Sequence, residues 1–191
     1  MAYTTTAQVK TYAGIGGSGD DILIGSLITY AQKAIDNYCN RTFEGSATNR
    51  VFDVGGDTEG NTLWFDEDCA SITTVTNGDA SSTEVTSAQY VTIPRNRTPY
   101  HGIKILSSAG KVWEYSTDPE GAITVNGVWA YSATAPNDIV HACTRLATFL
   151  YRQKDTSMDI DRPILTDAGV TLLPGSLPND VKTILEPYRR R

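Results

Sequence analysis

The chain has 191 residues, of which 40% are hydrophobic and 20% are charged, and its formal net charge is −6. These proportions are typical of a globular protein large enough to bury a core, and they exclude a chain that is disordered throughout. The negative charge argues against general nucleic-acid binding, which needs clustered Lys and Arg, and no apolar run is long enough to span a membrane.

The first predicted elements are a short helix and a glycine-rich loop. Thr5 or Thr6 can cap the helix, which continues to Ala13 and is closed by the first glycine of the loop. The loop sequence GIGGSG matches the G-x-G-x-x-G pattern of phosphate-binding loops, but that pattern follows a strand, and a helix is predicted here instead. We therefore interpret the loop as a hinge, formed by Gly14, Gly16, Gly17 and Gly19.

A long core helix is predicted between Asp20 and Asn40. Asp20 stands at the N-cap position, and Asn40 can end the helix in the left-handed conformation. Apolar residues recur at every third or fourth position, which is typical of one buried helix face. The predicted face consists of Leu23, Leu27, Tyr30 or Ala31, Ala34 or Ile35, and Tyr38.

From about Thr48 the chain is rich in Thr, Val, Gly and aromatic residues, in short alternating runs that predict β-strands. Asn77-Gly78 is a strong turn signal, and Asn126-Gly127 indicates a second turn or a bulge. Several short strands with frequent turns favour a small antiparallel sandwich or barrel. The predicted strands are Arg50–Val54, Thr62–Asp66, Ser71–Thr76, Gln89–Pro94, Ile103–Ser107, Lys111–Tyr115 and Ala122–Trp129.

A second strongly amphipathic helix is predicted from Pro136 to Gln153. It is expected to pack on the first long helix. A mostly irregular segment follows, with a strand indicated at Val170–Leu173, and a last helix begins after Pro178 and ends at Pro187. The side chains expected to be buried between the two long helices are Leu27, Ile35, Leu146 and Leu150.

The predicted fold class is therefore α+β. A small helical bundle frame of about four helices carries an inserted antiparallel β domain, which is a small sandwich or barrel. Residues 1–44 are predicted to form the N-terminal helices of the frame, 45–133 the inserted β domain, and 134–191 the rest of the frame. The last section includes an extended arm at 153–177 and the C-terminal helix and tail.

The cysteines allow an enzymatic alternative, a small cysteine-dependent hydrolase. Cys39, Cys69 and Cys143 form no Cys-x-x-Cys pair, and two of them lie on predicted helices as small core residues. A nucleophile at Cys143 would need His141 as its base, but residues two apart on a helix do not face each other. We therefore predict no catalytic residues and no cofactor.

Acidic stretches could offer oxygen ligands to calcium, but none has the EF-hand order with its closing Glu. We interpret them as solvated loops and predict no metal site. The stretches contain Asp53, Asp57 and Glu59, the acidic turn Asp66, Glu67 and Asp68, and the group Asp155, Asp159 and Asp161.

Aromatic residues in the predicted strands leave another function class open, a carbohydrate-binding β module of a virion or secreted protein. Such a module would stack sugars on exposed rings, whereas rings in the sheet core or in cross-strand pairs are the interpretation we favour. The residues concerned are Trp64, Trp113, Trp129, Tyr90, Tyr115 and Tyr131.

Three segments together resemble a known protein family. They are DDILIGSLITYAQKAIDNYCNRTF from Asp20 to Phe43, VNGVWAYSATAPNDIVHACTRLA from Val125 to Ala147, and the C-terminal SLPNDVKTILEPYRRR. In this order they resemble the first long helix, the strand–turn–helix and the closing helix of head–tail connector proteins of long-tailed bacteriophages, which are also called adaptor or head completion proteins.

The resemblance implies a structural virion protein that assembles in the host cytoplasm and ends at the neck, the head–tail interface. Its copies would form a ring, dodecameric by the resemblance, that binds the portal protein and connects the capsid to the tail. The ring would also carry the next neck or tail component, a stopper or tail terminator. Genomic DNA would pass through the lumen at ejection without specific binding.

The resemblance further suggests that the C-terminal helix and tail contact the portal. The helix is too short to be stable alone, so its apolar face must dock on something. Tyrosine and arginine are enriched at interface hot spots, and guanidinium groups suit carboxylates on a partner. The expected contact residues are Val181, Ile184, Leu185, Tyr188, Arg189, Arg190 and Arg191.

Overall fold

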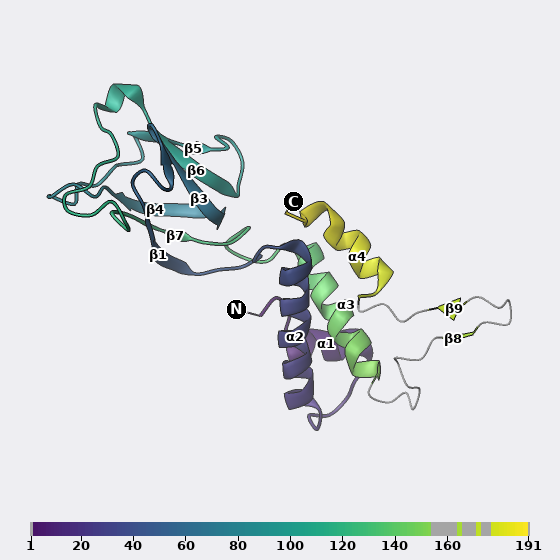
Figure 1. Cartoon of the computed structure of the whole chain (residues 1–191). Coiled ribbons are helices and arrows are strands. Elements are labelled where there is room, and N and C mark those ends of the chain that lie inside the picture. Colours follow the sequence, from purple (N-terminus) through teal and green to yellow (C-terminus); the bar gives the residue numbers. More distant parts are fainter. Residues whose placement is uncertain (1, 154–163, 166–170, 173–176, 191) are drawn as a thin grey trace. The chain divides into compact units, whose positions relative to one another are not determined.

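The computed structural model describes residues 2–153, 164–165, 171–172 and 177–190 (Figure 1). The chain divides into two compact units, a helical unit made of Met1–Asn40 with Pro136–Arg191 and a β unit made of Arg41–Ala135. Helices and antiparallel sheets in one chain confirm the predicted α+β class. In the described part of the chain, no helix is long and apolar enough to cross a membrane.

The first helix, α1 (Thr6–Ala13), begins with a capping box. The Thr5 side chain accepts a hydrogen bond from the Gln8 backbone N–H, and the Gln8 side chain accepts one from the Thr5 N–H at 2.8 Å. These two bonds satisfy backbone donors that a helix start leaves free. Gly14 ends the helix with a φ of 71°, in the left-handed region that glycine adopts most readily.

The other helices of this unit are α2 (Asp21–Cys39), α3 (Asn137–Gln153) and α4 (Asn179–Leu185), which runs into a 3₁₀ turn at Glu186–Tyr188. Helix α3 packs against α1, α2 and α4. The predicted packing of the two long helices is thus confirmed. The buried apolar side chains of these four helices are Val9, Ile24, Ile28, Ala31, Ile35, Cys39, Ile139, Ala142, Cys143, Leu146, Ala147, Val181 and Leu185.

The buried face of α2 includes Ala31 and Ile35, which were among the predicted alternatives, but its first half is one residue away from the predicted one. Ile24 and Ile28 are in the core, whereas Leu23 and Tyr30 are exposed and Leu27 is half-buried. Leu150 on α3 is also half-buried rather than buried. Apolar residues lie on both sides of α2, so the periodicity alone did not identify which side the core would take.

Both residues predicted to end α2 lie at its ends, but only Asn40 has the predicted role. Asn40 closes the helix with a φ of 51°, as predicted. Asp20 occupies the N-cap position, but its side chain makes no capping hydrogen bond and instead accepts one from the Tyr151 hydroxyl at 2.6 Å. The carboxylate therefore joins the start of α2 to the end of α3.

The β unit contains two antiparallel sheets with strand orders β1-β7-β4 and β2-β3-β6-β5. Side chains from both sheets enter one core, in which Phe52, Phe65 and Trp129 pack with ring centroids 5.1 to 5.6 Å apart. The strands are β1 (Ala47–Phe52), β2 (Thr58–Glu59), β3 (Thr62–Cys69), β4 (Ser71–Thr76), β5 (Tyr90–Ile93), β6 (Tyr100–Ile105) and β7 (Ile123–Val128).

One strand prediction was wrong, and of the turn or bulge predicted at Asn126-Gly127 there is no turn but an irregularity in the paired strand. The segment from Lys111 to Tyr115 is not a strand, because the Asn77 side chain hydrogen-bonds the Val112 carbonyl and the Glu114 N–H in place of a strand ladder. Asn126-Gly127 is no turn, but continues through β7. The irregularity lies opposite, in β4, where the register shifts between Ile72 and Thr74.

Beyond Gln153, two short strands pair antiparallel, β8 (Ile164–Leu165) and β9 (Thr171–Leu172). The second lies within the strand predicted at Val170–Leu173. The rest of the predicted arm between Gln153 and Leu177 lies outside the described residues, and this part includes Asp155, Asp159 and Asp161.

Candidate functional site

The C-terminus is held against the last turn of α2. The Arg190 backbone N–H donates to the Cys39 carbonyl at 2.9 Å, and the Cys39 thiol donates to the Leu185 carbonyl at 3.9 Å. The Tyr38 hydroxyl donates to a Glu186 carboxylate oxygen at 2.9 Å. The tail is therefore part of the folded helical unit.

A group of charged and tyrosine side chains lies on this surface, with Glu186 and Arg189 exposed and the others half-buried. We call it the C-terminal cluster: Tyr38, Glu186, Tyr188, Arg189 and Arg190. The Arg189 guanidinium lies 5.3 Å from the centre of the Tyr38 ring, and one of its nitrogens is 3.7 Å from Glu186. The hydrogen bond to the Glu186 carboxylate raises the pKa of the Tyr38 hydroxyl, because it stabilises the protonated phenol.

The structure separates the predicted portal-contact residues into two groups. Val181 and Leu185 are fully buried in the helical unit, so their side chains hold α4 in place and are not exposed to a partner. Ile184 and Tyr188 are half-buried, and the Tyr188 hydroxyl donates to Asp138. Arg189 and Arg190 retain exposed surface, and Arg191 lies outside the described residues.

The glycine loop is restrained by one lysine. Lys10 donates to the Gly17 carbonyl and forms an ion pair with Asp21 at 2.7 Å. Gly17 has a φ of 73°. Open space surrounds Gly14, Gly16, Gly17 and Gly19. A hinge role for these four glycines stays a prediction.

A buried ionic cluster in the β unit escaped the sequence analysis. The Asp68 side chain is only 1% exposed, and its oxygens lie 3.4 Å from Arg41 Nε and 3.6 Å from His101 Nδ1. Asp68 was predicted to lie in an acidic turn, but it is on β3 and points into the unit. Nothing in the local sequence indicates these partners, because they are far apart along the chain.

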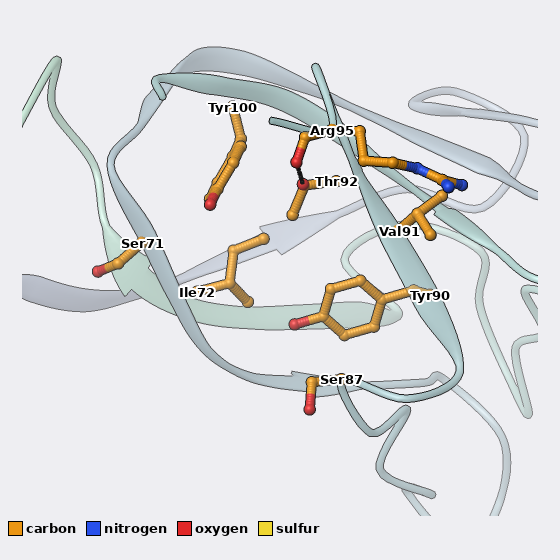
Figure 2. A pocket seen from close by; sticks show the side chains of 8 residues that line it. All are labelled: Ser71, Ile72, Ser87, Tyr90, Val91, Thr92, Arg95 and Tyr100. Atoms are coloured by element: carbon orange, nitrogen blue, oxygen red, sulfur yellow. Dashed lines mark hydrogen bonds between the residues drawn. The ribbon is translucent and has the colours of Figure 1, made fainter. Parts of the chain in front are cut away.

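A hollow of about 370 Å³ lies in the β unit beside β4, β5 and β6 (Figure 2). Figure 2 shows the Tyr90 and Tyr100 rings on either side of Ile72, with their hydroxyl groups directed into the hollow. Burial raises the pKa of Tyr90, so its hydroxyl is a hydrogen-bond donor at neutral pH. The Arg95 side chain extends away from Ile72.

The aromatic residues considered for sugar stacking mostly serve the fold. Trp113 and Trp129 are buried, and the Trp129 indole donates to the Thr48 carbonyl at 2.9 Å. Trp64 and Tyr115 are exposed, but Trp64 is on β3 while Tyr115 bridges to Gly78 after β4. Tyr90 and Tyr100, which line the hollow, are half-buried.

The chemistry of the cysteines disfavours a nucleophile. Burial raises the pKa of Cys143 to about 12, and it raises that of Cys69 to about 12 as well. Both remain thiols at neutral pH, whereas a catalytic cysteine needs a thiolate. His141 is exposed and lies edge-on to Tyr12, with ring centroids 5.9 Å apart.

Two of the acidic residues considered as calcium ligands accept backbone hydrogen bonds. Asp53 accepts from the Gly121 N–H at 2.6 Å, and Asp57 accepts from the Asp53 N–H at 2.8 Å. Among the residues that the structure describes, no group of three His, Cys, Asp or Glu side chains could hold a metal ion.

The sequence of the whole chain matches one family, described as head completion protein, over residues 2–191. The chain belongs to the head completion protein family. This confirms the resemblance to head–tail connector proteins on which the sequence interpretation depended. No curated protein matches the chain.

Two solved structures are similar to this head completion protein in fold. A chain from "Neck of empty GTA particle computed with C6 symmetry" has 17% identity and a TM-score of 0.59, and the match covers 97% of this chain and 89% of that one. A chain from "Virion of native gene transfer agent (GTA) particle" has 15% identity and a TM-score of 0.57, with the same coverage. The TM-scores establish a common fold, and at identities this low the similarity is one of fold alone.

Proposed function

We propose that this head completion protein is a structural component of the virion neck, where a ring of its copies lies below the portal and continues the DNA channel toward the tail. The observation that carries the proposal is the family match over residues 2–191. The fold similarity supports it, because one similar chain comes from the neck of a gene transfer agent particle and the other from a virion.

The symmetry of a similar assembly supports a closed ring. The neck that contains the first similar chain was computed with C6 symmetry, and cyclic symmetry repeats one set of contacts around an axis. We infer a dodecamer, because a ring of twelve identical copies also has a sixfold axis. The net charge of −6 per chain gives the ring an acidic character, which suits a channel that DNA phosphates must pass without binding.

The proposed portal contact is the exposed part of the C-terminal cluster. Arg189 and Arg190 place positive charge on an otherwise acidic protein, and Tyr188 adds an aromatic side chain of the kind enriched at hot spots. Val181 and Leu185 act indirectly, because their burial fixes the helix that presents the tail. The next neck component, a stopper or tail terminator, would then bind a different surface of the ring.

Complementation in vitro tests this function. DNA-filled heads assembled without the protein are mixed with tails, with or without the purified chain, and joined particles are counted by electron microscopy. The proposal predicts that joining requires the chain and that the chain is found at the portal vertex. Equal joining of heads and tails without the chain would overturn the proposal.

A further inference from the structure

The outward side of α2 carries no charge between Ile22 and Gln32, and the exposed Lys33 follows. We call this surface the α2 face and define it by Ile22, Leu23, Ser26, Thr29 and Tyr30, all of which are exposed. Ile22 is 89% exposed, Tyr30 is 63% exposed and Leu23 is 36% exposed. The sequence from 22 to 32, ILIGSLITYAQ, contains no charged residue, although 20% of the chain is charged.

The polar residues of the α2 face are turned toward their own helix. The Ser26 hydroxyl donates to the Ile22 carbonyl at 3.2 Å, and the Thr29 hydroxyl donates to the Gly25 carbonyl at 3.1 Å. A Cβ built on Gly25 would meet nothing within 4 Å. Small side chains with satisfied hydroxyls thus form a shallow surface between Ile22 and Tyr30, which another protein surface can approach closely.

None of the residues of the α2 face belongs to the buried core of its own subunit. The residues of α2 that pack inward, Ile24, Ile28 and Ala31, lie on the other side of the helix. Three large exposed apolar side chains on one face leave apolar surface in water, which is unfavourable unless a partner covers it.

We propose that the α2 face is the contact surface between neighbouring copies of this chain. The inference deepens the proposed ring and rests on it. Each copy carries a net charge of −6, so copies repel one another over most of their surface. The uncharged α2 face can be buried against a neighbouring copy without contributing an unpaired charge of its own, which makes it a surface suited to association.

The composition of the face excludes two other occupants. A helix that lies on a lipid surface carries Lys and Arg along its polar side, and a DNA-binding surface needs several cations. Between Asp21 and Lys33 the helix has neither, and Asp21 is paired with Lys10 at 2.7 Å.

The position of the face also separates it from the proposed portal contact. The C-terminal cluster is attached to α2 at Cys39, 17 residues from Ile22, which corresponds to about 26 Å along a helix. One subunit can therefore bind the portal through one end of α2 and a neighbour through the other. In a closed ring the α2 face must meet a different surface of the next copy, since identical faces would pair into dimers.

Photo-crosslinking from the face identifies its occupant. All three native cysteines are buried, so Ser26→Cys provides one thiol that a benzophenone maleimide can label in the folded chain. We expect irradiation of the labelled chain assembled on portals to give covalent dimers and higher multiples of this chain. Adducts with the portal protein alone, or no adducts, would contradict the inference. Ser107→Cys, on an exposed turn of the β unit, serves as the control position.

A charge placed on the face tests its role in assembly. Ile22→Lys should reduce ring formation on portals at least tenfold, because the lysine would be buried without a partner, while the high exposure of Ile22 leaves the free chain folded. Val112→Lys, at an apolar residue 50% exposed in the β unit, should leave ring formation unchanged.

The result also distinguishes this inference from the proposed function. Normal rings from Ile22→Lys would refute the α2 contact and leave the neck function intact. If the unaltered chain neither forms rings nor joins heads to tails, the proposed function itself fails.

Discussion

Asp68 on β3 forms a buried ion pair with Arg41, the first residue of the β unit, across 3.4 Å between Asp68 Oδ2 and Arg41 Nε. The Arg41 guanidinium also lies 5.2 Å from the centre of the Tyr131 ring, and the Tyr131 N–H donates to the Thr42 carbonyl at 2.8 Å. The two segments by which the chain enters and leaves the β unit are therefore fixed side by side, and Asp68 anchors one of them to the sheet.

Asp68→Ala should destabilise the β unit by about 3–5 kcal/mol, because it leaves a largely buried guanidinium without its carboxylate. All three tryptophans, Trp64, Trp113 and Trp129, belong to the β unit, so tryptophan fluorescence in a denaturant titration reports on this unit alone. Glu67→Ala is the matched control on the same strand. The Arg50–Glu67 pair is exposed, and its loss should cost at most about 1 kcal/mol. Equal costs for the two substitutions would contradict the buried pair.

Leu146→Ala should destabilise the helical unit by about 2–5 kcal/mol, because it opens a cavity at the α2–α3 contact. Far-ultraviolet circular dichroism follows the helices, while tryptophan fluorescence should keep its midpoint. The control, Leu23→Ala, removes a partly exposed leucine from the same unit and should cost less than about 1 kcal/mol. A cost below about half a kilocalorie for Leu146→Ala would mean that α2 and α3 do not share a core.

The helical frame could be predicted from the sequence because its signals are local. The Thr5 cap, the left-handed Asn40 and the stripe of α3 each act over a few residues. The side of α2 that faces the core could not be predicted in the same way. Ile22, Leu23 and Ile24 are consecutive apolar residues, and only packing against α3 decides that Ile24 is buried while Ile22 is exposed.

The candidate contact surfaces were less predictable because they depend on contacts that are distant along the chain. Arg190 was expected to contact the portal, and nothing local indicated that its N–H is bonded to Cys39 at the end of α2. Asp68 was expected in a solvated turn, yet its side chain is buried next to Arg41 and the partly exposed His101. Composition gave the sign of these charges, but tertiary packing determines which of them a partner can reach.

The buried thiols should make the protein sensitive to alkaline pH. The pKa of Cys143 rises from its ordinary value of 9.0 to about 12, so the folded state keeps this proton longer than the unfolded chain. The associated stability is complete below pH 9, and it is lost as the pH rises from about 9 toward 12. Cys143→Ala should flatten the decline of the unfolding free energy in this window. An unchanged slope would show that the thiol does not titrate in this way.

Arg189→Ala should weaken binding to portal rings at least tenfold without changing the melting temperature of the free chain. The Arg189–Glu186 pair is exposed, so its loss costs little in folding, whereas a guanidinium at an interface can bind a partner carboxylate. Arg145→Ala breaks a comparable pair with Asp180 and is the control for loss of a surface arginine. Binding can be measured by sedimentation with portal rings. Equal binding by all three proteins would remove Arg189 from the portal contact.

Cryo-electron microscopy of portal-containing heads incubated with the purified chain tests the neck function most directly. The account predicts a closed ring of copies on the tail side of the portal, around an open channel, with the C-terminal cluster against the portal and the α2 face against the neighbouring copy. A head whose portal vertex carries no additional density, or a chain bound elsewhere on the capsid, would contradict it.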